Sequence, residues 1–334
     1  MKALVYTGPH AMEVRDVADP TPAASDEVLI RVEACGICGS DMHAWHGHDE
    51  RRPAPLVLGH EAVGTIVEGD RAGTRVAVNP LVTCQSCEHC RSGRENLCFT
   101  RQIISMPPRE GAFSQFIAVP ERNLVPVPDH VKPVAASLTE PLACGWHAVR
   151  LADQAMFKPM ADARVLVLGG GAIGLGAALA LRIFGAIDIW IAETNEVRHA
   201  ALKKAGDFKV YDPRAGTGPE DNTVDLIIDG VGYAATRQAA TATIKSGGTI
   251  VHIGLGEATG GLDIRRMTLQ EITFIGTYTY TVQDFKDTAA AIFDGRYGPL
   301  DWVDLRPLDA GPAAFQEIDK GQAHSPKIIL EPWS

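Results

Sequence analysis

Four cysteines lie within fifteen residues of one another, at a spacing that suits a single metal ion. Cys84, Cys87, Cys90 and Cys98 form the pattern C-x2-C-x2-C-x7-C. Four thiolates can complete a tetrahedron around one Zn²⁺, which leaves no open position for a substrate. The residues between the first three cysteines are polar, which favours an exposed metal loop over a core of buried thiols. The pattern therefore predicts a structural zinc site that holds a loop in place and takes no part in catalysis.

A second set of metal-binding residue types is dispersed over about a hundred residues. Cys38 lies in GICGSDMH, His60 and Glu61 lie in LGHEAVG, and Glu140 lies in TEPLACG. Each alone has an ordinary structural explanation, such as a packed cysteine or a carboxylate in the first turn of a helix. Each also lies beside glycine or proline, where site-forming loops are expected. A mixed set of sulfur, nitrogen and oxygen ligands with one open position is typical of catalytic zinc.

A glycine-rich turn in the second half of the chain indicates a dinucleotide site. Gly169, Gly171 and Gly174 form G-x-G-x-x-G between an apolar strand and a helix, and Glu193 ends the next strand. The glycines permit a tight turn, approach of a pyrophosphate and close helix packing. Glu193 is expected to accept hydrogen bonds from ribose hydroxyls and to repel a 2′-phosphate, which favours NAD over NADP. Arg198 could stack on the adenine or could be solvated.

Composition restricts the class of protein. The 334 residues are 46% hydrophobic and 22% charged, as in ordinary globular proteins, and their length allows two domains. The formal charge of −10 argues against nucleic acid and acidic membranes as partners. No apolar run reaches the ~18 residues of a membrane span, and the first residues read as a strand rather than a signal peptide. Seven cysteines, mostly placed for metal binding, favour a reducing cytoplasm over disulfides.

The pattern of strands and helices changes near residue 140. Before it, short strands between turns predict an all-β, barrel-like unit; after it, strands and helices alternate, which predicts a doubly wound parallel sheet and a mixed α/β class. Strands are expected at 164–170, 187–193, 223–232, 248–255 and 272–280, and helices at 137–153, 172–185, 196–206 and 233–248. The tail is expected to rejoin the first unit. The predicted domains are 1–142 with 285–334, including a zinc lobe at about 80–100, and 143–284.

The order of the motifs along the chain resembles one enzyme family. GICGSDMH, LGHEAVG, CQSCEHCRSGRENLC, TEPLACG and VLVLGGGAIG together resemble the zinc-dependent medium-chain dehydrogenase superfamily, and most nearly its sorbitol (polyol) dehydrogenase and L-threonine dehydrogenase branch. The resemblance covers nearly the whole chain. It implies a GroES-like catalytic domain, a Rossmann NAD-binding domain, and two zinc ions in each chain, one catalytic and one structural.

The resemblance also implies roles for the dispersed metal-binding residues. Cys38, His60 and Glu61 match the catalytic zinc ligands of the polyol branch. Glu140 matches the position that supplies the last ligand, directly or through water. Liver- and yeast-type alcohol dehydrogenases place a cysteine at that position, so Glu140 favours polyols and related secondary alcohols as substrates.

Further residues match positions that handle the substrate and the proton. Ser40 matches the hydroxyl that hydrogen-bonds the substrate oxygen, and Asp41 matches a carboxylate that orients the histidine ligand. His43 matches a histidine that relays the proton, and Ile173 matches the branched residue behind the nicotinamide ring. The arginine that holds a polyol in sorbitol dehydrogenases has only an offset equivalent here, Arg306.

These features predict an enzyme that transfers hydride from a secondary alcohol, of the polyol or sugar-alcohol type, to NAD. L-Threonine 3-dehydrogenase, or another small-alcohol dehydrogenase of the same fold, is the alternative. A non-enzymatic relative would be expected to lack the catalytic ligands, and a zinc-ribbon nucleic-acid module would need basic residues around the cysteines. The β-branched and aromatic segment at 272–280 is a plausible pairing edge for a homodimer or homotetramer.

Overall fold

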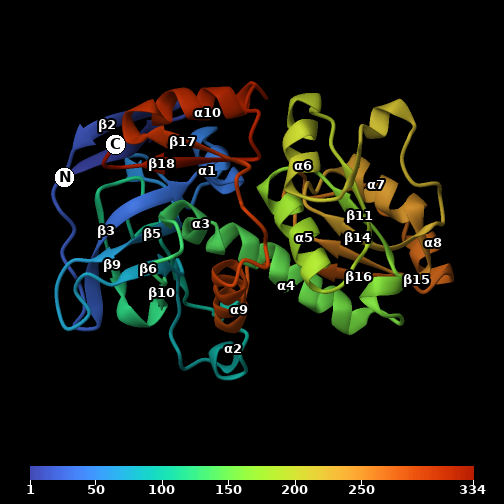
Figure 1. Ribbon diagram of the computed structural model, residues 1–334, viewed down its shortest axis with the longest axis horizontal. Helices are drawn as coiled ribbons and strands as arrows, with labels where there is room; N and C mark the ends of the chain where they lie inside the picture. The colour runs from blue at the N-terminus through green and yellow to red at the C-terminus, as the bar shows by residue number, and fades with distance from the viewer. The chain divides into compact units, whose positions relative to one another are not determined.

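The computed structural model describes all of residues 1–334, which divide into two compact units (Figure 1). Unit 1 comprises Met1–Glu140, Thr281–Arg296 and Val303–Ser334, and unit 2 comprises Pro141–Tyr280 and Tyr297–Trp302. Unit 2 is therefore inserted into unit 1 along the chain. The domain boundaries drawn from the sequence lie near these limits and stay predictions, because compactness alone does not show that either part is an independent domain.

Unit 1 is built on two main sheets. The first has the strand order β2-β1-β4, and the second has the order β10-β6-β5-β3-β18-β17, with β9 also pairing with β3. Their strands are β1 (Lys2–Gly8), β2 (Ala11–Asp16), β3 (Glu27–Gly36), β4 (Leu56–Val57), β5 (Glu61–Ile66), β6 (Arg75–Val78), β9 (Phe116–Pro120), β10 (Leu124–Pro126), β17 (Val303–Pro307) and β18 (Lys327–Glu331). A small pair, β7 (Leu81–Val82) with β8 (Gln102–Ile103), flanks the cysteine-rich segment. The strand-rich, barrel-like character predicted for this part is confirmed by these pairings.

Strand β3 lies between the early and the late parts of unit 1. On one side it pairs antiparallel with β5, so that Gly36 lies opposite Glu61. On the other side it pairs antiparallel with β18, so that Gly36 lies opposite Ile329. Figure 1 shows β18, near the C-terminus, in the same sheet as β3 and β5, and β3 separates it from β5. The tail of the chain therefore completes the sheet that carries the first metal-binding motifs.

Short helices connect the strands of unit 1. They are α1 (Gly39–Trp45), α2 (Glu88–Arg91), α3 (Pro133–Ser137), α9 (Val282–Phe293) and α10 (Gly311–Asp319), while α4 (Thr139–Ala155) begins in unit 1 and continues in unit 2. Local sequence explains their starts. At α9, the backbone N–H of Asp284 donates to the Thr281 hydroxyl oxygen at 3.1 Å, and the backbone N–H of Thr281 donates to Asp284 Oδ2 at 3.1 Å. This reciprocal capping satisfies amide groups that a helix leaves free at its first turn.

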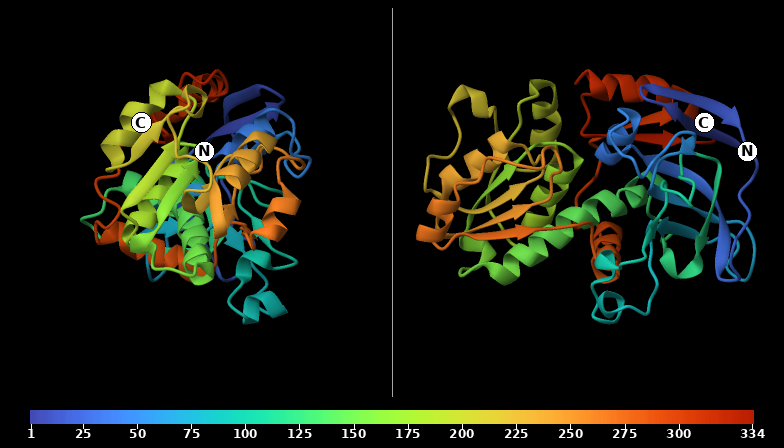
Figure 2. Two further views of the ribbon diagram at one scale, coloured as in Figure 1. Left: turned by 90° about the vertical axis from the view of Figure 1, so that its right-hand side faces the viewer. Right: turned by 180° about the vertical axis from the view of Figure 1, so that it is seen from behind.

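Unit 2 is a six-stranded parallel sheet with the order β13-β12-β11-β14-β15-β16. The strands are β11 (Arg164–Leu168), β12 (Asp188–Ala192), β13 (Lys209–Tyr211), β14 (Val224–Asp229), β15 (Ile244–His252) and β16 (Thr273–Gly276). The helices after them are α5 (Ala172–Ile183), α6 (His199–Ala205), α7 (Ala234–Thr243) and α8 (Ile264–Leu269). Figure 2 shows helices on both faces of this sheet. In chain order the sheet reads 3-2-1-4-5-6, the dinucleotide-binding arrangement, which confirms the predicted doubly wound fold.

Two predicted elements of unit 2 have different limits in the structure. The helix expected at 233–248 ends at Thr243, and Ile244 begins strand β15. Ile244 is β-branched and extended (φ −68°, ψ 139°), and it pairs with Val224 of β14. Sheet pairing therefore outweighs the helical pattern at these residues. The strand expected at 272–280 is shorter, since β16 covers only Thr273–Gly276.

Candidate active site and cofactor-binding loop

The turn after strand β3 places Cys38 at the start of helix α1. The backbone N–H of Cys38 donates to Asp41 Oδ2 at 3.0 Å, and the backbone N–H of Gly59 donates to Asp41 Oδ1 at 3.3 Å. Asp41 is fully buried. One carboxylate therefore joins the turn that carries Cys38 to the loop that carries His60, although the two are distant in sequence.

Cys38, His60 and Glu61 form a compact cluster of metal-binding atoms. One ligand atom from each lies within 4.8 Å of the others; His60 and Glu61 are buried and Cys38 is half-buried. A tetrahedral zinc ion about 2.0–2.3 Å from each donor needs them about 3.3–3.8 Å apart, so small side-chain adjustments would complete the geometry. Glu140, predicted for the same site, is not one of the three; it is buried near the start of α4.

Buried polar groups orient the His60 ring. Its Nδ1 atom lies 3.4 Å from Ser105 Oγ and 3.5 Å from Asp41 Oδ1. Burial acts to raise the pKa of Asp41, but the neighbouring His60 and Arg52 lower it below its ordinary value. Asp41 is therefore a carboxylate, which holds a proton on Nδ1 and leaves Nε2 of His60 as the ligand nitrogen. This geometry fits the orienting role predicted for Asp41.

Lys327, at the start of strand β18, pairs with Glu61. Its Nζ atom donates to Glu61 Oε1 at 2.6 Å, to Oε2 at 2.7 Å and to the Ile37 carbonyl at 2.8 Å. Both side chains are almost fully buried. Burial acts to lower the pKa of Lys327, but the negative charges of Glu61, Cys38 and Glu140 raise it above its ordinary value. Lys327 is therefore a buried cation whose charge balances the anionic groups of the cluster.

Gly36 makes room for this pair. A side-chain carbon at position 36 would lie only 2.0 Å from Glu61 Oε2, so the carboxylate passes over a position that must lack a side chain. The sequence analysis did not identify Lys327 as part of the site. The available signal was a lysine that opens the otherwise apolar terminal strand KIIL.

Arg52 and Ser105 are two further residues near the cluster that the sequence analysis did not identify. Arg52 is buried; its Nε donates to the Ser105 carbonyl at 3.0 Å and its Nη1 to the Ser40 carbonyl at 2.7 Å. It thus braces the first turn of α1, where Ser40 is half-buried, while His43 lies three residues further along the helix and is exposed. Ser40 and His43 therefore lie on neighbouring positions of one helix face.

The four clustered cysteines have the sulfur spacing of a metal site. The Sγ atoms of Cys87 and Cys90 are 3.5 Å apart, those of Cys84 and Cys98 are 3.5 Å apart, and those of Cys84 and Cys90 are 3.9 Å apart. Sulfurs at about 2.3 Å from one zinc ion would be about 3.8 Å apart, whereas a disulfide needs about 2.05 Å. Hydrogen bonds from Ser86 and Cys87 lower the pKa of Cys84 to about 5, which favours its thiolate.

The glycine turn after β11 has the shape that the sequence predicts. Gly169 has a φ of +93°, which strains any residue with a side chain. A side-chain carbon on Gly174 would lie 1.9 Å from the Gly169 carbonyl oxygen, whereas one on Gly171 would meet nothing within 4 Å. The turn therefore packs tightly at Gly174 and leaves open space at Gly171, at the N-terminus of α5, where a pyrophosphate is favoured. Ile173 is half-buried in the same first turn.

Glu193 closes this turn from the end of strand β12. Its Oε2 accepts from the Gly170 N–H at 2.9 Å, and its Oε1 accepts from the Asn195 N–H at 2.7 Å. Arg198 Nη1 lies 3.9 Å from Glu193 Oε2, and its buried Nε has no hydrogen-bond partner. The carboxylate is therefore held rigidly beside the glycine loop. This placement is compatible with the ribose-binding role predicted for it.

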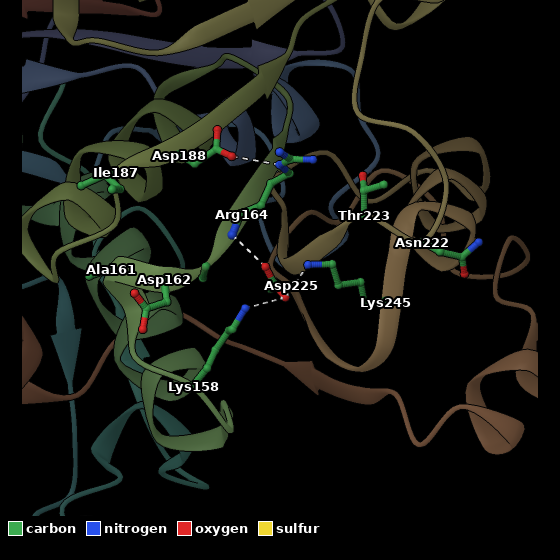
Figure 3. Close-up of a pocket in the computed structure, with 11 residues that line it drawn as sticks. Lys158, Ala161, Asp162, Arg164, Ile187, Asp188, Asn222, Thr223, Asp225 and Lys245 are labelled. Atoms are coloured by element: carbon green, nitrogen blue, oxygen red, sulfur yellow. Dashed lines mark hydrogen bonds and ion pairs between the residues drawn. The ribbon is translucent and has the colours of Figure 1, made fainter.

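A separate cavity in unit 2 lies at the amino ends of the parallel strands, whereas the glycine turn lies at their carboxyl ends. Its volume is about 450 Å³, and Figure 3 shows Arg164, Asp188 and Asp225 at the amino ends of β11, β12 and β14. Asp225 accepts from Lys158 at 3.1 Å and from Lys245 at 3.0 Å, so its charge is matched. Ligands of such sheets bind outside the carboxyl ends of the strands, where the glycine turn lies. This cavity is therefore not the cofactor site.

Comparison with known proteins agrees with these features. Residues 24–129 match the alcohol dehydrogenase GroES-like domain, and residues 172–294 match the zinc-binding dehydrogenase domain. L-Galactonate-5-dehydrogenase of Escherichia coli strain K12 is 33% identical to the chain over 89% of its length and 88% of the relative's. The chain belongs to the zinc-binding alcohol dehydrogenase family. This confirms the predicted medium-chain dehydrogenase relationship.

Two further relatives of this dehydrogenase extend the comparison. Sorbitol dehydrogenase of Bacillus subtilis strain 168 is 34% identical over 84% of this chain and 82% of its own. The structure of acetophenone reductase from Geotrichum candidum in complex with NAD superposes with a TM-score of 0.88 at 26% identity, covering 99% of this chain and 97% of that one. The enzyme class predicted from the sequence, a nicotinamide-dependent alcohol dehydrogenase, is thereby confirmed.

The Lys327–Glu61 pair yields a test of stability. Lys327→Met should lower the free energy of unfolding of the dehydrogenase by roughly 3–5 kcal/mol, because it leaves Glu61 buried without its partner. Urea denaturation monitored by circular dichroism measures the change. The exposed Lys320→Met serves as the matched control. The double variant Lys327→Met/Glu61→Gln should recover much of the loss, and a single variant as stable as the wild type would contradict the argument.

The Glu193 carboxylate yields a test of cofactor choice. Glu193→Gln should weaken NADH binding and narrow the preference for NADH over NADPH, because it removes the charge that repels a 2′-phosphate. Fluorescence titration with both cofactors measures the two dissociation constants. Glu196→Gln, an exposed neighbour, should leave both unchanged. An unaltered NADH-to-NADPH ratio in Glu193→Gln would show that this carboxylate does not face the ribose.

Proposed function

We propose that this chain oxidises secondary alcohols of the polyol or sugar-alcohol type with NAD, at a catalytic zinc ion held by Cys38, His60 and Glu61. The observation that carries the proposal is the convergence of a thiol, an imidazole and a carboxylate within 4.8 Å. The donor set fits zinc, since it mixes sulfur, nitrogen and oxygen and leaves a position for substrate. Glu140 would supply the fourth ligand, directly or through a water molecule, until a substrate oxygen takes that position.

The four-cysteine cluster would hold a second zinc ion in each chain. Its sulfur separations of 3.5–3.9 Å bracket the edge of a zinc–thiolate tetrahedron, about 3.8 Å. All four ligand positions would be filled by protein, so this ion would stabilise the segment between β7 and β8 and would not contact substrate.

The residues around the catalytic cluster suit removal of a proton and a hydride. Zinc bound there would act as a Lewis acid that lowers the pKa of the substrate hydroxyl. Ser40 would accept the hydroxyl proton and release its own toward the cofactor ribose, and His43, on the same helix face, would pass the proton to solvent. Partial desolvation of the exposed His43 ring and the nearby charges of His48 and His46 lower the pKa of His43, so its imidazole is neutral near pH 7 and can accept a proton. With that proton removed, the alcohol carbon would release a hydride and become a carbonyl carbon, and a bound NAD would supply the hydride acceptor.

The polyol assignment is supported by Glu140 and by the sorbitol dehydrogenase relative. Arg306, the offset equivalent of the polyol-binding arginine, is already engaged. Its guanidinium donates to Asp304 at 2.7 Å and to Glu317 at 2.8 Å. A polyol would have to displace these carboxylates to use Arg306, so a smaller secondary alcohol, or L-threonine, is the second candidate substrate class.

A substrate panel tests the reaction and separates the two classes. Purified enzyme should reduce NAD when substrate is added, and the absorbance of the nicotinamide ring at equal substrate concentrations measures the rate. The substrates to compare are sorbitol, xylitol, L-threonine and simple secondary alcohols. Polyols should give the highest kcat/KM, and a strong chelator should abolish turnover. Highest activity with L-threonine would move the assignment to the alternative class.

Cys38→Ser should lose turnover and one zinc per chain while still binding NADH. Loss of NADH binding by this folded variant would contradict separate metal and cofactor sites.

His43 yields a test of the proton path. His43→Gln should reduce kcat by roughly 10- to 100-fold, at the low end of acid–base contributions. The wild-type rate should fall at acidic pH as His43 becomes protonated, and the variant should lack this limb of the pH profile. His130→Gln, at an exposed histidine elsewhere in unit 1, is the matched control. An unchanged kcat and pH profile in His43→Gln would remove His43 from the path.

The proposal includes an assembly and a cellular location. Strand β16 forms an edge of the unit 2 sheet and exposes Phe274 in part, so edge pairing could join nucleotide-binding units into a homodimer or homotetramer. All seven cysteines are free thiols in the structure, which suits the cytoplasm. No helix of the structure has both the length and the apolar character needed to cross a membrane. The net charge of −10 disfavours nucleic acid as a partner.

A further inference from the structure

A third group of metal-binding side chains lies on unit 1, apart from both cysteine-containing clusters. His10 occupies the turn between β1 and β2, His46 follows the last residue of α1, and Asp319 ends α10. One ligand atom from each lies within 4.8 Å of the others. We propose that these three residues bind a divalent transition-metal cation of the zinc class, at a site that joins the hairpin, α1 and α10.

The three side chains are held together by the packing beneath them. The backbone N–H of His10 donates to the Trp45 carbonyl at 2.7 Å, and the His10 ring meets the Trp45 ring edge-on with centroids 4.5 Å apart. Trp45 is buried and contacts Phe315 of α10, with ring centroids 6.2 Å apart. An apolar contact thus fixes the three elements, and the polar groups project from their shared edge. The site is therefore largely formed before any cation arrives.

The ends of two helices converge at the site. His46 Nε2 lies 2.7 Å from Asp319 Oδ1, so the carboxyl end of α1 meets the carboxyl end of α10. A helix carries partial negative charge at this end, where an acidic residue is unfavourable and a cation is stabilising. Asp319 adds a full negative charge at that place. A bound cation would satisfy both helix ends and the carboxylate.

The ion pair between His46 and Asp319 does not by itself explain why His10, His46 and Asp319 lie together. The two side chains are 28% and 38% exposed, and an ion pair this open contributes little to stability. His10 adds a second imidazole, with its ring centroid 5.3 Å from that of His46. Two imidazoles and one carboxylate form a ligand set that binds zinc, nickel or copper, and the exposure of His10 and Asp319 leaves room for water ligands.

The site bears on the catalytic region through α1. This helix begins next to Cys38 and carries Ser40, Asp41 and His43, and its far end is at His46. A cation that ties His46 to His10 and Asp319 would restrain the helix at the end opposite the catalytic cluster. Binding should therefore raise thermal stability, because a ligand that binds only the folded state stabilises it.

The test uses full-length enzyme loaded with zinc and freed of loosely held metal by gel filtration, without substrate or NAD. Isothermal titration with Zn²⁺, and separately with Ni²⁺, should show one further equivalent per chain and a higher melting temperature. His46→Gln and His10→Gln should each weaken this binding by at least about tenfold, since even partners that only orient a ligand are worth roughly 10- to 100-fold in metal affinity.

Controls separate this site from the rest of the protein. His130→Gln changes another exposed histidine of unit 1 and should bind the further equivalent as the wild type does. Asp319→Asn should weaken binding and abolish the melting-temperature shift. The proposal is overturned if the wild type binds no further equivalent, or if His46→Gln and His10→Gln bind it unchanged. Because the assay measures neither turnover nor NAD binding, its outcome is independent of the proposed alcohol oxidation.

Discussion

A buried carboxylate keeps its charge only where cations or hydrogen-bond donors replace its lost hydration, and at Glu61 this constraint organises the centre of unit 1. Glu61 is fully buried, and its two oxygens are held by Lys327. A divalent ion, Lys327 and Arg52 would together bring four positive charges, which the Cys38 thiolate and the carboxylates of Glu61, Asp41 and Glu140 would match. The cluster is thus close to electrically neutral once a metal is bound. Removing any one of these groups would leave a desolvated charge in the interior.

The fold brings these charges together through a single strand. Strand β3 pairs with β5, which begins at Glu61, and also with β18, which begins at Lys327. Gly36 stands at the end of β3 between them, and the next turn carries Cys38 into α1. Early and late parts of the chain must therefore both be in place before the site exists. The insertion of unit 2 between them separates these parts in sequence without altering the sheet.

The glycine turn after β11 differs from the metal-binding cluster, because its residues lie close together in sequence. The strand, turn and helix from Arg164 to Ile183 are consecutive, and the close approach of Gly174 to the Gly169 carbonyl depends only on this short segment. Glu193 comes from the adjacent strand β12 and binds the Gly170 N–H. Steric demands of this kind restrict residue type at fixed spacing, and for that reason the glycine pattern could be recognised without a structure.

The cysteine spacing, the glycine turn and the order of the motifs are visible in the amino-acid sequence, and they determined the family, the two-part architecture and most of the candidate metal-binding residues. The tertiary structure alone placed Arg52, Ser105 and Lys327 around the cluster of Cys38, His60 and Glu61 and ended α7 at Thr243. Spacing along a chain encodes contacts within a few residues or within one supersecondary unit. Lys327 and Glu61 are 266 residues apart, and nothing local requires either to be buried. Their pairing is decided only when β18 and β5 come to flank β3, because burial then forces each charge to find its opposite.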